Sequence, residues 1–190
     1  MQNTHFRQSR RALLAGAGTL AALAPLVGFS SRARAAELVE IENFDAAGKS
    51  LGKLRVPAIV KSEAEWRRLL APESFEVVRH AGTETAYTGA YWDLHKDGLF
   101  RCVCCATALF DARSKFDSGT GWPSFTAPIS RDNVVQTSDG SLGMERTQVA
   151  CKRCNAHLGH VFDDGPPPTG LRYCMNSAAL VFAARASTRA

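Results

Sequence analysis

Hydrophobic and polar positions alternate in short runs along most of this chain, and such runs are typical of strands rather than long helices. Residues 36–61 alternate mildly, and Pro57 places any strand there at a sheet edge, because proline cannot donate to the ladder. Five further apolar runs are bounded by clusters of Gly, Pro, Asp and Ser. These predicted strands cover residues 100–104, 134–137, 146–151, 171–175 and 178–182.

One short helix is predicted, and it begins at Ser62. The Ser62 oxygen can accept from a helix amide while Glu65 reaches back to the serine amide, which makes a capping box. Trp66 and Leu69 follow at helical spacing, and Pro72 is expected to end the run. The expected fold is therefore mainly β: a small antiparallel β-sheet domain with few short helices.

Composition and charge narrow the class of protein. A chain of 190 residues with 45% hydrophobic side chains can build one ordinary core. The net charge of +5 suggests a polyanionic partner until it is located along the chain. Residues 1–35 hold five arginines and no acid, so the remainder carries as many bases as acids. We therefore expect no nucleic-acid partner.

The first 35 residues have the pattern of an export signal. Arg10 and Arg11 precede an uncharged, modestly apolar stretch, and Ala33-Arg34-Ala35 offers small residues for cleavage. This pattern resembles a twin-arginine signal peptide, so we expect an exported, periplasmic protein with no stable membrane insertion after cleavage. An uncleaved membrane anchor is the alternative, since the stretch is just long enough to span. The mature chain would comprise an extension over 36–61, a domain over 62–182 and a tail over 183–190.

Four of the six cysteines form two pairs with the spacing of metal ligands. Each pair is a Cys-x-x-Cys, which directs two thiolates at one tetrahedral metal, so we expect one structural zinc per chain that staples distant strands. Three alternatives stay open: disulfides, which export favours; a local site joining the second pair to two histidines; and a redox-active pair. The four predicted ligands are Cys102, Cys105, Cys151 and Cys154.

Cys174 differs from these four because charge, rather than spacing, marks it. Arg172, two residues earlier, carries a guanidinium that stays protonated, and nearby positive charge stabilises a thiolate. We therefore predict a reactive thiol at Cys174, kept partly ionised by Arg172.

Three longer motifs surround these residues. Residues 116–125 read FDSGTGWPSF, residues 157–166 read HLGHVFDDGP, and residues 172–177 read RYCMNS. Together with the cysteine pairs they resemble the B-type methionine sulfoxide reductases over about residues 62–182. The resemblance implies a small antiparallel β fold, one zinc held by the two cysteine pairs, and the R epimer of methionine sulfoxide in peptides or proteins as substrate.

The resemblance also implies roles for individual residues. Cys174 would attack the sulfoxide sulfur and end as a sulfenic acid, which another thiol can reduce. His157, His160 and Asn176 would supply or position a proton for the sulfoxide oxygen, and Asp164 would orient that group.

The Gly-Trp-Pro-Ser-Phe segment implies a pocket and also departs from the family pattern. Trp122 would form the wall of a pocket for the substrate methyl group, with Phe125 adding to the same surface. Many relatives carry a resolving cysteine where this chain has Thr120. Either Cys104 replaces it or an external, thioredoxin-like dithiol attacks the sulfenic acid. We favour the external route, because moving Cys104 would disturb the adjacent ligand Cys105.

Two other classes of function remain open at this point. A zinc-ribbon binding module without chemistry is opposed by the charge balance and by the arginine-flanked Cys174. A general thiol-disulfide oxidoreductase would require a metal-free, redox-active cysteine pair.

Overall fold

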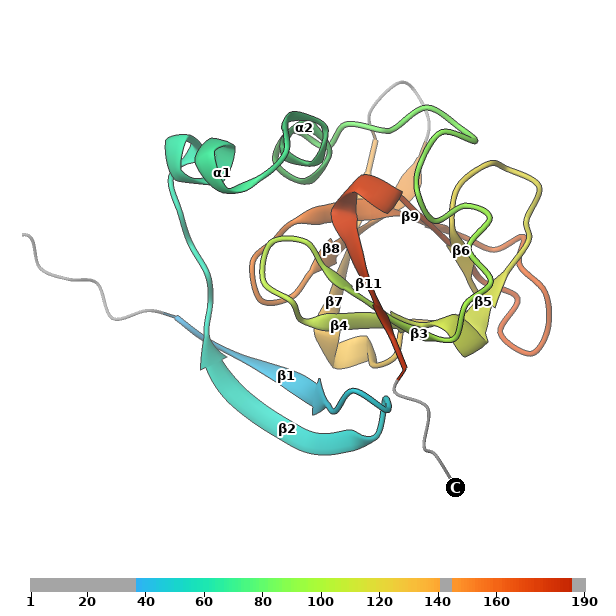
Figure 1. Ribbon diagram of the computed structural model, residues 1–190, viewed down its shortest axis with the longest axis horizontal. Coiled ribbons are helices and arrows are strands. Elements are labelled where there is room, and N and C mark those ends of the chain that lie inside the picture. Colours follow the sequence, from blue (N-terminus) through green and yellow to red (C-terminus); the bar gives the residue numbers. More distant parts are fainter. Residues whose placement is uncertain (1–36, 141–144, 186–190) are drawn as a thin grey trace, which may run out of the picture. The chain divides into compact units, whose positions relative to one another are not determined.

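The computed structural model describes residues 37–140 and 145–185, and it confirms a mainly β architecture (Figure 1). The described residues form three sheets, in which every pairing is antiparallel, and two short α-helices. The expected signal peptide and residues 186–190 of the expected tail lie outside the described residues. No helix of the described part is long and apolar enough to span a membrane.

A six-stranded sheet forms the centre of the fold, in the order β5-β6-β10-β9-β8-β7. The predicted strand over 146–151 is confirmed residue for residue, whereas the strand over 157–162 was not predicted, because histidine and glycine obscure its apolar pattern. The strands of the six-stranded sheet are β5 (Lys115–Phe116), β6 (Ser124–Phe125), β7 (Val134–Asp139), β8 (Arg146–Cys151), β9 (His157–Phe162) and β10 (Arg172–Met175).

A three-stranded sheet, in the order β11-β3-β4, lies against the core of the central sheet. Its strands are β3 (Gly98–Cys102), β4 (Ala108–Asp111) and β11 (Leu180–Ala184). The rings of Phe110 and Phe125, one from each sheet, stack with centroids 4.4 Å apart, and Phe100 meets Phe125 edge-on at 5.0 Å. The predicted strand over 178–182 begins later than expected, because Ser177–Ala179 form a single 3-10 turn, η4.

The helix predicted to begin at Ser62 is present as α1 (Glu63–Leu69), with both hydrogen bonds of the capping box. Helix α1 ends before Pro72, as expected, but a second helix that was not predicted follows at once. Pro72 is the first residue of a second helix, α2 (Pro72–His80), since proline lacks only an amide that the first turn leaves unpaired anyway. Helix α2 buries Phe75, Val77 and Val78 and contacts β9 and η4.

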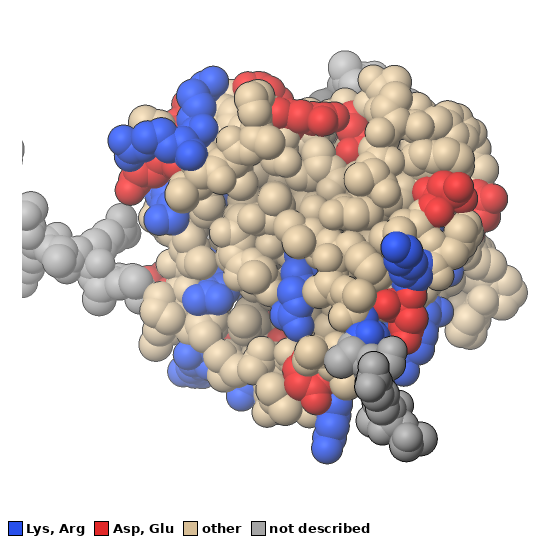
Figure 2. All heavy atoms as spheres, viewed as in Figure 1, with Lys and Arg blue, Asp and Glu red and all other residues tan. Residues whose placement is uncertain are grey.

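The N-terminal hairpin pairs β1 (Leu38–Phe44) with β2 (Ser50–Pro57) as a separate two-stranded sheet. Pro57 is the last residue of β2, consistent with an edge position. The fully buried Asn133 side chain fastens the hairpin, accepting from the Glu42 amide at 2.8 Å and donating to the Glu42 carbonyl at 2.9 Å. On the face shown in Figure 2, basic and acidic side chains are interspersed over the described residues.

Candidate active site and metal centre

Cys174 lies in the middle of the central sheet, on β10 between β6 and β9. It is paired with Ser124 on one side and with His160 on the other. Residues paired across antiparallel strands have Cβ atoms about 5 Å apart and face the same side of the sheet. The thiol is half-buried. Backbone pairing alone therefore brings the Ser124 hydroxyl and the His160 imidazole beside a partly accessible sulfur.

Gly159 allows β9 and β10 to approach each other at this point. A Cβ atom on residue 159 would overlap the Cys174 carbonyl oxygen, and its φ of +154° is one that other residues rarely adopt. The glycine of the His-Leu-Gly-His segment therefore serves the strand pairing beneath the site, between the two histidines predicted to act in it.

Burial and nearby polar groups act on the Cys174 thiol in opposite directions. Burial raises its pKa above the ordinary value, and this effect outweighs the opposing influence of Arg172, Thr120 and Ser124. The guanidinium favours the thiolate as the sequence predicted, but it does not overcome the loss of solvent.

Asp164 holds Arg172 in place instead of orienting the histidines. The Arg172 Nε and Nη2 atoms donate to the two Asp164 carboxylate oxygens, each at 2.8 Å, and the guanidinium lies 4.4 Å from the centroid of the Phe162 ring. These hydrogen bonds lower the Asp164 pKa. The pair fixes the direction of the positive charge next to Cys174.

The carboxylate that contacts His160 belongs to Asp139, a residue that sequence reasoning missed. His160 Nε2 lies 2.7 Å from Asp139 Oδ2, and Arg146 donates to the same oxygen at 3.1 Å. Asp139 is the last residue of β7, where it pairs with Arg146 of β8, so it reaches His160 only through the sheet. No local motif marks this position in the sequence.

His157 is a buried imidazole without a polar partner. It is 4% exposed, and neither ring nitrogen forms a hydrogen bond with the described residues. Burial lowers its pKa to about 4, with His160 acting in the same direction, so His157 is neutral near pH 7. Its ring centroid lies 5.4 Å from that of His160.

Trp122 and Asn176 are both tied to Glu84, a second residue that sequence reasoning missed. The Trp122 indole Nε1 donates to the Glu84 carbonyl at 3.0 Å, and the Asn176 Oδ1 accepts from the Glu84 amide at 3.0 Å. Asn176 Nδ2 donates to the Leu158 carbonyl at 3.1 Å. Both polar atoms of the Asn176 side chain are thus bound to backbone, which makes it a support of the site.

Phe125 lies in the core and not on the substrate surface that the sequence suggested. Side chains alternate along a strand, so Ser124 of β6 faces Cys174 whereas Phe125 pairs with Tyr173 on the opposite face. Phe125 is 0% exposed and stacks on Phe110. It therefore supports the sheet behind the thiol.

The four cysteines predicted as metal ligands come together at the other end of β9. Their sulfur atoms all lie within 4.8 Å of one another, with Cys102 and Cys154 sulfurs 3.6 Å apart and Cys105 and Cys151 sulfurs 3.5 Å apart. Four sulfurs 2.3 Å from one zinc would be about 3.8 Å apart at tetrahedral angles. The cluster has the size that such an ion requires, and it excludes both histidines of the alternative local site.

The two halves of this cluster are built alike. In each turn the residue after the second cysteine has a left-handed backbone, Ala106 with φ 57° and Asn155 with φ 53°. Their amides donate back to the carbonyls of Cys102 and Cys151, at 2.8 and 2.9 Å. Equal turn geometry directs both pairs of sulfurs into one volume and joins the β3–β4 turn to the β8–β9 turn.

Cys104 lies at this cluster, where its thiol interacts with Cys102 and Cys154. Strand β9 adjoins the cluster at its first residue, His157. His160, which pairs with Cys174, is three residues further along the strand, or about 10 Å from His157. A disulfide needs Cα atoms within about 7 Å of each other. Cys104 is therefore badly placed to meet Cys174 without rearrangement.

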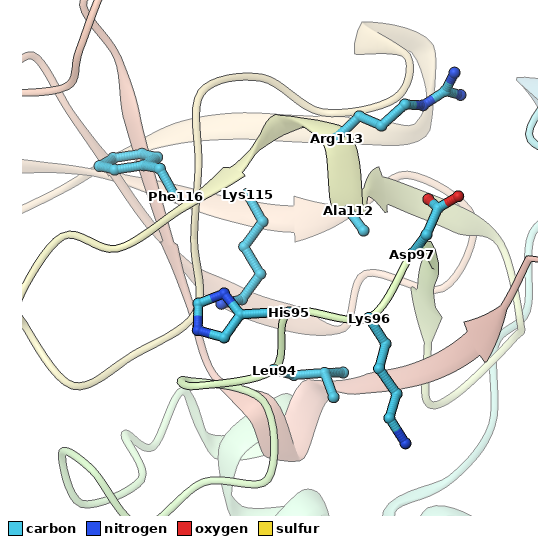
Figure 3. A pocket seen from close by; sticks show the side chains of 8 residues that line it. All are labelled: Leu94, His95, Lys96, Asp97, Ala112, Arg113, Lys115 and Phe116. Carbon is cyan, nitrogen blue, oxygen red and sulfur yellow. The ribbon is translucent and has the colours of Figure 1, made fainter.

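A pocket of about 300 Å³ lies elsewhere, between residues 94–97 and residues 112–116 (Figure 3). Two of its basic groups are already engaged: Lys115 donates to the Trp92 carbonyl at 2.9 Å, and Arg113 binds Asp111 at 2.7 Å. None of the predicted site residues lines it.

Comparison with known proteins gives a consistent result. The SelR domain matches residues 70–184. The peptide methionine sulfoxide reductase MsrB of Herminiimonas arsenicoxydans is 56% identical over 124 residues, covering 65% of this chain and 90% of the relative. The protein of the same name from Thiobacillus denitrificans is 55% identical over 122 residues, 64% of this chain and 92% of its own. The chloroplastic peptide methionine sulfoxide reductase B1 of Arabidopsis thaliana is 53% identical over 128 residues, covering 67% of this chain and 63% of the relative.

Proposed function

Because the chain belongs to the B-type, SelR-domain family of peptide methionine sulfoxide reductases, we propose that it reduces the R epimer of methionine sulfoxide in peptides and proteins, with Cys174 as nucleophile. Reduction of methionine sulfoxide itself follows from the family. The observation that carries the finer proposal is the cross-strand pairing of Cys174 with His160, next to the buried His157.

The first step is attack by the Cys174 sulfur on the sulfoxide sulfur. The sulfoxide is reduced to a thioether, the cysteine sulfur is oxidised to a sulfenic acid, and the oxygen passes to Cys174 overall. Burial raises the Cys174 pKa, so the thiol must lose its proton as substrate binds. Arg172, held by Asp164, supplies the positive charge that favours the thiolate at that moment.

The sulfoxide oxygen needs a proton, because an unprotonated oxide is too basic to leave the sulfur. His160 is suited to deliver it, since it pairs across the strands with Cys174 and its ring is held by Asp139 at 2.7 Å. His157 is neutral near pH 7 and has a ring nitrogen free of described partners, so it is suited to hold the oxygen or a water on it. The two rings would then share one proton path.

Selection between epimers requires fixed positions for the methyl group and the oxygen. The partly buried Trp122 indole, anchored through Glu84, offers an apolar wall for the methyl group. With the oxygen directed toward the histidines and the sulfur toward Cys174, only one handedness at sulfur fits three such contacts.

We further propose that one zinc ion is held by Cys102, Cys105, Cys151 and Cys154. Bound there it would contribute its binding free energy to folding and take no part in the reaction. The sulfur separations of 3.5 and 3.6 Å and the matched turns support this assignment.

Regeneration of Cys174 is proposed to use an external, thioredoxin-like dithiol. Thr120 stands beside Cys174, at the position where the family resemblance implies a resolving cysteine in many relatives, and Cys104 lies against the four-cysteine cluster. The first external thiol would form a mixed disulfide with Cys174 and release water, and the second would release the reduced enzyme.

Export through a twin-arginine route remains a proposal that rests on residues 1–35. Arg10, Arg11 and the small residues before position 36 support it. Location outside the cytoplasm would place the enzyme where methionines are exposed to oxidants. Its dithiol reductant would then need reducing equivalents from the cytoplasm.

Separate assays of the two epimers of N-acetyl-methionine sulfoxide test the function. We expect the R epimer to be consumed and the S epimer to remain, with one equivalent of sulfenic acid trapped on Cys174 when no reductant is added. Equal consumption of both epimers would contradict the proposal, as would reduction without oxidation of Cys174.

A further inference from the structure

Glu84 stands out because a buried acid is normally paired with a base, and this one is bound to backbone instead. It is 4% exposed, and among the described residues its carboxylate forms no ion pair. Its two oxygens accept from the backbone amides of Ser177 at 2.7 Å and Ala178 at 2.8 Å. Charge-assisted hydrogen bonds of this kind are among the stronger ones in proteins.

These two amides begin the η4 turn, which follows Cys174 by only three residues. The N-cap residue Asn176 makes no capping bond of its own, because its amide is bound to the Glu84 amide and to the Leu158 carbonyl. The Glu84 carboxylate, more than 90 residues earlier in the chain, performs that capping function. The chain just after the thiol is therefore held by one distant side chain.

The backbone of Glu84 reaches the other side of the site. Its carbonyl accepts from the Trp122 indole at 3.0 Å, and its amide donates to the Asn176 side chain at 3.0 Å. One residue thus links the indole wall to the end of the strand that carries Cys174.

Gly89 gives an independent sign that this arrangement is closely fitted. A Cβ atom at residue 89 would overlap both the Glu84 Oε1 and the Ser177 Oγ atoms. The Ser177 hydroxyl is itself fixed, because it accepts from the Tyr91 amide at 3.1 Å. The backbone at Gly89 can pass the carboxylate only because it lacks a side chain.

We propose that Glu84 is a positioning residue for this reaction, setting the distance between the Trp122 wall and the Cys174 strand without contacting substrate. The inference rests on the proposed function, because it assigns Glu84 a role in binding the sulfoxide. Loss of one carboxylate oxygen leaves a buried amide unpaired, which displaces η4 or the segment that carries the Trp122 acceptor.

Two variants test this independently. In Glu84→Gln one oxygen becomes an amide group that cannot accept, and Gly89→Ala crowds the carboxylate without changing any polar group. For N-acetyl-methionine-R-sulfoxide we expect KM to rise about tenfold in both, because the methyl wall is displaced. Alkylation of Cys174 by iodoacetamide, which needs no indole wall, is expected to change less than twofold.

Asp111→Asn is the matched control. Asp111 is also a buried acid, 8% exposed, but it binds Arg113 and Arg185 on the three-stranded sheet. The Asp111→Asn variant is expected to lower Tm without changing KM. Should Glu84→Gln fail to fold, Gly89→Ala decides. A KM within twofold of wild type in every folded variant would overturn the inference.

The Trp122 indole N–H resonance in a ¹H–¹⁵N spectrum separates this inference from the proposed function. It can be assigned by its absence in Trp122→Phe, and it is expected to shift in Glu84→Gln and Gly89→Ala but not in Asp111→Asn. If wild type reduces neither epimer, the proposed function fails, and the resonance still reports the positioning. An unshifted resonance in both test variants would show that Glu84 does not position Trp122.

Discussion

The two ends of β9 place cysteine sulfur in opposite surroundings. At the end that begins with His157, four sulfurs lie within 4.8 Å of one another. Near the other end, Cys174 lies alone opposite His160, half-buried among hydroxyls and a guanidinium. The two ends of β9 therefore separate sulfurs suited to a metal from the sulfur that we propose as nucleophile.

This difference shows that neighbours, and not the cysteine itself, decide the chemistry. In the cluster each thiol faces other thiols, which a tetrahedral cation satisfies. At Cys174 the neighbours are polar groups that favour ionisation and burial that opposes it. Four substitutions, taken from the largest expected effect to the smallest, test the separation.

Replacing the single reactive sulfur should have the largest effect. In Cys174→Ser the hydroxyl is a far poorer nucleophile toward sulfoxide sulfur, so we expect reduction of the R epimer to fall more than about 1,000-fold. Tm and zinc content should stay as in wild type, measured by calorimetry and mass spectrometry of the intact protein. Residual turnover within tenfold of wild type would show that another group attacks the substrate.

Removal of a clustered sulfur should affect stability instead. Cys151→Ser would take one ligand from the proposed zinc, and we expect the free energy of unfolding to fall by about 3 kcal/mol or more, or Tm to fall by about 10 °C. A chelator should have the same effect on wild type and little further effect on the variant. An unchanged Tm with no bound zinc would contradict a structural metal.

Arg172→Gln should weaken the reactive character of Cys174 without removing it. The guanidinium opposes the effect of burial, so its loss raises the Cys174 pKa further. The pH profile of iodoacetamide alkylation should move to higher pH, and the rate at pH 7.5 should fall about fivefold. Arg113→Gln, which breaks a similar pair with Asp111, is the control and should leave the profile unchanged.

Cys104→Ser should have the smallest effect. Its sulfur lies at the cluster and has no proposed role in the cycle, so dithiol-driven turnover should stay within about twofold of wild type if the proposed external thiol resolves Cys174. Peptide mapping after one equivalent of substrate should find no disulfide between residues 104 and 174. Loss of turnover with zinc and the first reduction step intact would make Cys104 the resolving residue.

Local signals in the sequence predicted what depends on neighbours along the chain. The capping box at Ser62, the strand over 146–151 and each Cys-x-x-Cys pair follow from residues within six positions of one another. The meeting of the two pairs was predicted from the four sulfur ligands that one tetrahedral metal requires. Pro72 correctly marked the end of the first helix, but α2 was missed, because its buried face is set by packing against β9 and η4.

The residues that escaped prediction reach the site through the sheet or across the core. Asp139 meets His160 from 21 positions away, because two strand pairings bring β7 and β9 near each other. Glu84 meets Ser177 from 93 positions away. A single acid at the end of a strand, such as Asp139, or in a loop, such as Glu84, carries no periodicity and no motif, so tertiary pairing alone reveals it. Asp164 was found from the sequence, but its partner is Arg172.

The strand register that sets Cys174 opposite His160 fixes their separation through the backbone. The separation of thiol and imidazole is fixed by strand spacing, so thermal motion of the surrounding turns changes it little. Surface segments at the rim of the site can then vary in length and sequence while Cys174 and His160 keep their geometry. An engineer who wished to change which proteins this enzyme repairs could therefore rebuild the rim and leave β9 and β10 untouched.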